Sequence, residues 1–210
     1  MLAARNRLVV PVSASAPITY SDTGAGTKAG ASTWTYTHSG IAGNCILVFV
    51  SSLNVATITA KVGGSSGTPM TQIGSNYQFV SGSFLAIFSL LNSGLTGNQT
   101  IYLSTPSSLY VAVNSISYKN VSSVSSLVTN NGTGTAATIS LSPSASQLAV
   151  AAFSGYSTSS PISSASPNQR FNISGAQSVS FSLAAADGTT SPSATLASSI
   201  QWGAAGVLLS

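Results

Sequence analysis

Hydrophobic and polar positions along the chain form short runs that are typical of β-strands. The most continuous apolar run, residues 45–50, follows the turn pair Gly43-Asn44 and is rich in β-branched and aromatic residues. It therefore predicts a strand buried on both faces. The next run, residues 56–62, alternates apolar with polar positions and ends at Gly63-Gly64, as a half-exposed strand does. Together they predict a sheet with one central and one outer strand.

Further strands are predicted wherever an apolar or alternating run lies between turn residues. They cover residues 32–38, 70–79, 83–91, 99–104, 109–118, 137–141, 147–153, 171–173, 179–183, 193–196 and 200–209. The glycines between residues 24 and 30 predict a loop, and the pairs Asn131-Gly132 and Asp187-Gly188 predict turns. No stretch shows a sustained helical period with caps. We therefore predict an all-β chain that forms a two-sheet, jelly-roll-like β-sandwich.

Two of these strands resemble each other. Residues 44–51 and residues 147–154 each begin with a polar residue, continue as a two-faced apolar strand and end at a serine. This similarity predicts equivalent central strands, either of two sheets or of two Greek keys. The match is too short to identify a repeat by itself.

The composition is unusually poor in charge. Charged residues make up 4% of the chain and the net charge is +4, whereas about a quarter of an average soluble domain is charged. The bases form no stripe interleaved with aromatics, so nucleic-acid binding is not predicted. A hydrophobic content of 43% with dense strand patterning argues against disorder. No run reaches the ~18 apolar residues of a membrane helix, and membrane insertion is not predicted.

The reactive side chains suggest no enzyme. Cys45 stands alone in an apolar run and is expected to be a small buried hydrophobe. His38 closes an aromatic stripe, has no cysteine or acid at ligand spacing, and is expected to be hydrogen-bonded at a strand end rather than to bind metal. Asp22 and Asp187 adjoin turn residues and are expected to be solvated. Residues 63–67 match G-x-S-x-G, but a strand pattern follows where a nucleophile elbow needs a helix. We predict no catalytic, cofactor-binding or metal-binding residues.

Residues 1–15 are predicted to form an extended arm ahead of a single β-sandwich domain of residues 16–210. The apolar part of this arm is short for a signal peptide and contains Pro11, which suits an extended segment. We expect the arm to contact a neighbouring copy in a symmetric homo-oligomer, a trimer or a multi-copy lattice. An arm that folds back along its own sandwich edge remains the alternative. The predicted inter-subunit contacts are Arg5, Arg7, Leu8, Val9 and Val10.

Exposed aromatic side chains supply the remaining candidate site. Aromatic residues are found more often in cores and interfaces, but they also line sugar and protein contacts. The candidates for a glycan or protein contact are Tyr77, Tyr102, Tyr110, Tyr156 and Trp202.

Several signatures together resemble a known group of proteins. They are the segment from Trp34 to His38, residues 43–50, residues 60–64 with 69–71, residues 85–91, residues 118–121, residues 147–150 and the apolar terminal strand. The pattern is similar to β-sandwich domains of minor tail proteins of actinobacteriophages and of related bacterial surface proteins. The resemblance implies a jelly-roll-like fold and a structural role in the virion, in some cases with adhesion or glycan contact. It transfers no functional residue.

On this basis the sequence predicts a bacteriophage virion structural protein, namely a minor tail protein at the tail tip or tail that contacts the host surface. It would be assembled in the host cytoplasm and located in the virion. Its expected partners are copies of itself, other virion proteins and a host cell-surface glycan, with no cofactor. A carbohydrate-binding or adhesion module, or a capsid decoration protein, is the alternative.

Overall fold

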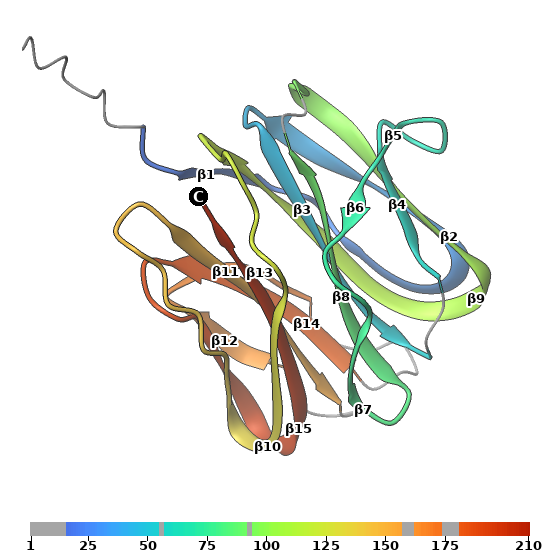
Figure 1. Ribbon diagram of the computed structural model, residues 1–210. Helices are drawn as coiled ribbons and strands as arrows, with labels where there is room; N and C mark the ends of the chain where they lie inside the picture. Colours follow the sequence, from blue (N-terminus) through green and yellow to red (C-terminus); the bar gives the residue numbers. More distant parts are fainter. Residues whose placement is uncertain (1–15, 55–56, 92–93, 157–161, 174–180) are drawn as a thin grey trace, which may run out of the picture.

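The computed structural model describes residues 16–54, 57–91, 94–156, 162–173 and 181–210. Their regular structure consists of β-strands, which form two antiparallel sheets packed face to face (Figure 1). The predicted all-β, two-sheet sandwich is therefore confirmed. The predicted arm, with Arg5, Arg7, Leu8, Val9 and Val10, lies outside the described residues.

The first sheet uses the first half of the chain, residues 19–119. Its strands are β1 (Thr19–Thr23), β2 (Thr27–Ile41), β3 (Cys45–Leu53), β4 (Thr59–Val62), β5 (Thr68–Pro69), β6 (Thr71–Gln72), β7 (Tyr77–Val80), β8 (Ser83–Leu91) and β9 (Gly97–Lys119). Strand β3 lies between β8 and β9 and is buried on both faces, which confirms the predicted central strand. Strand β4 pairs with β9.

The second sheet uses the second half, residues 122–210. Its strands are β10 (Val128–Thr138), β11 (Leu148–Tyr156), β12 (Ile162–Ser166), β13 (Asn168–Ile173), β14 (Phe181–Gly188) and β15 (Ser193–Leu209). Strand β11 lies between β14 and β15. The two similar apolar runs of the sequence are thus the central strands β3 and β11 of two sheets, one of the two predicted arrangements.

Each half ends in one long bent strand where the sequence predicted two. Strand β9 pairs with β2 and β4 through residues 97–104 and then with β2, β1 and β3 through residues 109–119. The serine- and proline-containing residues between these parts resemble a turn. They form a bulge instead, because an extra-residue irregularity bends a strand while the ladder continues on both sides. Strand β15 likewise covers both of its predicted strands.

Other predicted turns also lie inside paired strands. Asn131-Gly132 is part of β10 and Asp187-Gly188 is part of β14. The predicted loop of residues 24–30 gives way to β2 at Thr27. In each case cross-strand pairing in the folded chain overrides the local turn preference.

The first sheet curls until it is nearly a barrel. Strand β5 pairs with β4 and strand β6 pairs with β8, and only Met70 separates β5 from β6. One short segment therefore joins the two ends of the sheet. The curled sheet encloses an inner core that includes Trp34, Ile46, Phe88 and Leu103.

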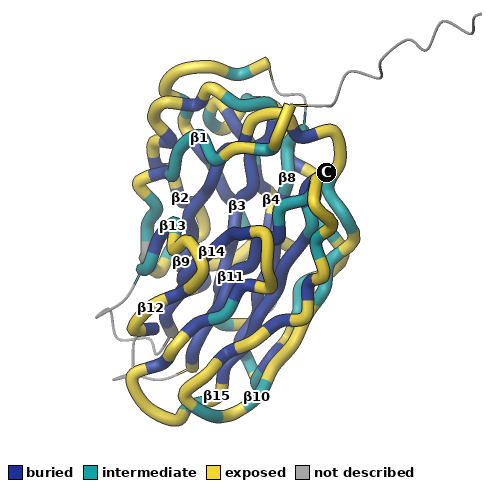
Figure 2. The backbone as a smooth tube through the Cα atoms, turned by 90° about the vertical axis from the view of Figure 1, so that its left-hand side faces the viewer, coloured by how far each residue is buried: buried dark blue, intermediate teal, exposed yellow. Residues whose placement is uncertain are grey.

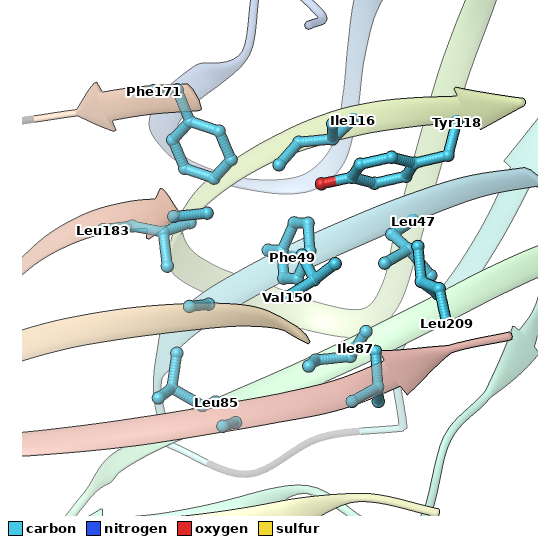
Figure 3. Packing of buried hydrophobic residues seen from close by; sticks show 14 of the residues in the cluster. Leu47, Phe49, Leu85, Ile87, Ile116, Tyr118, Val150, Phe171, Leu183 and Leu209 are labelled. Carbon is cyan, nitrogen blue, oxygen red and sulfur yellow. The ribbon is translucent and has the colours of Figure 1, made fainter. Parts of the chain in front are cut away.

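A separate core lies between the two sheets. It is formed by the outer faces of β3, β8 and β9 against β11, β14 and β15 (Figure 3). Phe49, Ile87 and Tyr118 contribute from the first sheet, and Leu183 and Leu209 from the second. Because β3, β11 and β14 have a core on each face, they are buried along nearly their whole length (Figure 2).

Candidate functional site

The outer face of the first half carries a patch of hydroxyl side chains, which we call the threonine face. Its members are Thr33, Thr35 and Thr37 of β2, Thr59 and Lys61 of β4, and Thr100, Tyr102 and Ser104 of β9. These positions alternate with residues of the inner core, so their side chains point outward. The threonines are exposed, while Lys61, Tyr102 and Ser104 are partly buried.

Strand register arranges these side chains in rows. Thr35, Tyr102 and Lys61 are direct cross-strand partners. Thr33, Ser104 and Thr59 form the next row, and the hydroxyls of Thr59 and Ser104 lie 2.6 Å apart. Rows in a sheet repeat about every 6.7 Å along a strand, with neighbours about 4.8 Å away across it. The face therefore presents a grid of neutral hydroxyls around one aromatic ring and one ammonium group.

The predicted G-x-S-x-G segment borders this face as a hairpin turn between β4 and β5. Gly63 and Gly64 have φ angles of 96° and 89°, a region that favours glycine. The Lys61 ammonium donates a 2.6 Å hydrogen bond to the carbonyl of Ser65. The turn is followed by a strand, as the sequence indicated, and Ser65 is held here only through its backbone carbonyl.

The other aromatic candidates are dispersed. Tyr110 and Tyr156 are 43% and 39% exposed, and Tyr77 is partly buried beside a hollow of about 300 Å³. Partial burial raises the pKa of Tyr77. Trp202 is only 6% exposed and packs in the inner core of the second half, so its inclusion among exposed aromatics was wrong. Of the five, Tyr102 is the one set in the threonine face.

His38 lies in a closed polar cluster. Its Nδ1 is 2.7 Å from the Ser115 hydroxyl and its Nε2 is 3.2 Å from the Ser117 hydroxyl, and all three side chains are buried. The expected hydrogen-bonded histidine is confirmed, although it lies inside β2 rather than at its end. Burial lowers the pKa of His38 to about 4, against a smaller raising effect of Asp22. The ring is therefore neutral at pH 7 and has no access to solvent.

The sequence did not identify Ser115 and Ser117 as the partners of His38. Alternation along β9 contains the signal, because Val111 and Val113 of the inner core place residues 115 and 117 on the same face. What the sequence lacks is the pairing of β2 with β9 and the bend of β9 toward β2.

The expectation that Asp187 is a solvated turn residue was wrong. Asp187 is fully buried in β14, where Arg170 donates to it from Nε and from a terminal guanidinium nitrogen, each at 2.8 Å. Tyr118 of the first half donates to the same carboxylate at 2.8 Å. Burial and the carboxylate both raise the pKa of Tyr118 well above its ordinary value, so the phenol remains a donor. The guanidinium of Arg170 also stacks over the Tyr20 ring at 3.9 Å.

This network links the two halves. It joins β14 and β13 of the second sheet to β9 and β1 of the first. A charged pair held by several hydrogen bonds specifies how two surfaces meet. We therefore interpret it as a structural connection between the sheets.

Cys45 is buried as expected. Burial raises the pKa of its thiol to about 12, so the nucleophilic thiolate is scarce at neutral pH. Among the described residues, no group of three or more His, Cys, Asp or Glu side chains is placed to hold a metal ion. In the same part of the chain, no helix is long and apolar enough to span a membrane.

Comparison with known proteins identifies no relative. No protein-family model, no curated protein and no solved structure matches this chain.

Proposed function

We propose that the chain is a structural protein of a bacteriophage virion, a minor tail protein present in several copies. The observation that carries the proposal is the charge-poor, hydroxyl-rich exterior on a rigid β framework. A chain with only 4% charged residues has little of the surface charge that keeps free monomers apart, so it suits close packing in an assembly. The strand and turn signatures described above support the same role.

Purified virions provide the direct test. Mass spectrometry of particles, with copy number measured against the major tail and capsid proteins, should find the chain at a defined multiple per particle. Detection in the infected cell but not in purified particles would refute the virion role.

Self-association is the associated proposal, with residues 1–15 contacting a neighbouring copy. Analytical ultracentrifugation of the chain with and without residues 1–15 addresses it, and we expect loss of the oligomer in the shortened chain. An unchanged oligomer with a lower melting temperature would instead favour an arm that covers the edge of its own sandwich.

We further propose that the protein is not an enzyme. The described groups with the greatest catalytic potential, His38, Asp187 and Cys45, are each buried in the body of the molecule. Replacing His38, Asp22 and Asp187 together by neutral residues in a folded variant should leave the biological activity intact. Loss of a measurable turnover in that variant would refute the proposal.

A carbohydrate-binding role is the second candidate, and the threonine face favours it. The apolar face of a sugar ring packs on aromatic rings such as that of Tyr102. Hydroxyl groups both donate and accept hydrogen bonds, which matches the neighbouring Thr35 and Thr100. Lys61 is the only charged residue in this patch, and its ammonium already donates to the Ser65 carbonyl, so hydroxyls and the Tyr102 ring dominate the face and suit a neutral glycan.

Removing the Tyr102 ring tests this role, with another tyrosine of the same strand as the control. We expect binding on an array of neutral host glycans to be lost in Tyr102→Ser and retained in Tyr110→Ser, which removes a more exposed ring outside the face. Equal loss in both variants, or binding that persists in Tyr102→Ser, would exclude the threonine face as the site.

A further inference from the structure

The two halves of the chain have the same strand topology. In each half the long last strand lies between two of the earlier strands: β9 lies between β2 and β3, and β15 between β10 and β11. Strand β3 also pairs with β8, which in turn pairs with β6. In the same way β11 pairs with β14, which pairs with β13. A short strand, β4 or β12, pairs with the beginning of the last strand. Six strands therefore correspond in the same order along the chain.

The correspondence extends to register and to the bulge. In the first half, the β2–β9 ladder runs as far as Ala31 opposite Leu109 and resumes with Thr33 opposite Ser104. In the second half, the β10–β15 ladder runs as far as Gly134 opposite Ile200 and resumes with Ala136 opposite Thr195. In both halves the irregularity omits one residue of the earlier strand and four residues of the long last strand. A bulge is a specific local feature, so its recurrence at matched positions is not a general property of sheets.

The edge of each half also corresponds. Strand β1 pairs with the end of β9, with Thr19 opposite Lys119 and Asp22 opposite Ser117. In the second half, Ser122 and Ser125 donate backbone hydrogen bonds to the carbonyls of Ser210 and Leu208, the matching positions at the end of β15. The match therefore extends from Thr19 to Lys119 in the first half and from Ser122 to Ser210 in the second.

Much of the contact between the halves is reciprocal, as between two copies related by a two-fold axis, while β7, which has no matching strand among the described residues of the second half, adds contacts with β10 and β15. Strand β8 contacts β15 while β9 contacts β14, and β3 contacts β14 while β8 contacts β11. Under the strand correspondence, these are two reciprocal pairs, which define an isologous interface. Ser51 and Ser154 occupy matched positions on β3 and β11, and their hydroxyls are hydrogen-bonded at 2.8 Å. A residue touches its own symmetry mate only beside the axis.

We infer that the chain is a tandem duplication of one β module, fused so that its two copies form an intramolecular homodimer. The junction has suitable geometry. Asn120 donates to the carbonyl of Pro17, and Ser122 is hydrogen-bonded to Ser210. The start of the first half, the junction and the end of the second half therefore meet at one place. The core between the sheets is then the dimer interface of the module, and its natural partner is a second copy.

A pair of circular permutants of the full chain tests the inference. In both, Ser210 is joined to Met1, so that residues 1–15 form the connection. One is opened at the junction between Val121 and Ser122, and the matched control is opened between Ser65 and Ser66 inside the first half. The junction permutant should keep its melting temperature within about 4 °C, a shift typical of small stability changes, while the control loses more. A junction permutant less stable than the control would overturn the inference.

An experimental structure of the unaltered chain gives a second test that does not depend on a variant. Superposing the matched strands of the two halves should require a rotation of about 180° and should align the two bulges. A rotation far from a half-turn, or bulges at unmatched positions, would overturn the inference.

Discussion

The two halves share a backbone arrangement but fill it differently. The inner core of the first half contains Trp34, Tyr36 and Phe88. At the positions matching these three residues, the inner core of the second half has Ala137, Ile139 and Ala186. At these three positions the ladders thus enclose large side chains in the first half and smaller ones in the second, whereas Trp202 and Phe153 of the second half match Val111 and Val50 of the first. The difference shows that register and bulge placement depend on the alternation of buried and exposed positions rather than on particular core residues.

Polar clusters differ between the halves in the same way. The position of His38 in the first half corresponds to Leu141 in the second, and both side chains are buried. Conversely, Asp187 of the second half corresponds to Ser89 of the first. His38 is therefore replaced by an apolar residue and Asp187 by an uncharged one at the matched positions, so neither polar cluster is needed to form the shared fold.

The largest effect is expected from exchanging the large and the small core side chain at one matched position, Phe88 in the first half and Ala186 in the second. Phe88→Ala should lower the free energy of unfolding by about 3–5 kcal/mol, because it leaves a cavity in the first inner core. Ala186→Phe should cost about 1–3 kcal/mol by overpacking the second. Urea unfolding measures both. Since the two positions lie in separate cores, the double variant should show the sum; recovery of stability in it would contradict the distinction between the cores.

Removing the buried carboxylate should have the next largest effect. Asp187→Asn leaves the Arg170 guanidinium without its counter-ion, and we expect a loss of about 3 kcal/mol, because breaking a buried pair costs more than the pair contributes. The side chain of Arg170 is 22% exposed, which keeps the effect at the low end. Ser89→Ala, at the matched position, should change stability by less than about 0.5 kcal/mol. Similar losses in the two variants would contradict the proposed connection between the sheets.

Low pH should destabilise the fold through His38, a group that the second half lacks at its matched position. Because the folded-state pKa of about 4 lies below the ordinary histidine value, the unfolded chain binds the proton first. Stability is therefore fully present above about pH 6.5 and falls as the pH drops toward 4, by up to about 3 kcal/mol. His38→Leu, which copies Leu141, should remove this dependence. Urea midpoints at about pH 7.0 and 4.5 measure the difference. If stability depends on pH in the variant as it does in the natural chain, a group other than His38 causes the effect.

The smallest predicted effect lies beside the two-fold axis. Ser51→Ala and Ser154→Ala should each cost about 1 kcal/mol, because each leaves a buried hydroxyl without its partner. The double variant should cost less than the sum, since it removes both members of the hydrogen bond. A double-mutant cycle measures this coupling, and strict additivity would show that the serines do not interact in solution.

Much of the fold was predictable, because it depends on local alternation. The central strand β3, the outward threonines of β2 and the class of the fold all follow from the spacing of apolar residues. The continuity of β9 and β15 was not predictable, since Ser107 and Ser108 have the same local preference in a turn and in a bulge. The ladder that decides between them involves residues far away in the sequence.

The candidate site was predicted only in part. Tyr102 was named as an aromatic contact, but its threonine neighbours come from three strands whose pairing the sequence does not contain. Asp187 was misplaced because Asp-Gly is a strong turn signal and Arg170, its partner, lies on a different strand. The duplication was visible as one short similarity that ends at Ser51 and Ser154, and only the register of the remaining strands reveals its extent.

The placement of β9 as the last strand of its sheet has a consequence for how the protein folds during synthesis. Strands β2, β3 and β4 pair with β9, so the first sheet cannot close until residue 119 has left the ribosome. All of its ladder partners are then available, and the first half can complete its inner core before the second half is made. Until β11, β14 and β15 arrive, however, the outer face of β3, β8 and β9 is an exposed apolar surface. Nascent chains on one polysome would therefore be most prone to associate in that interval.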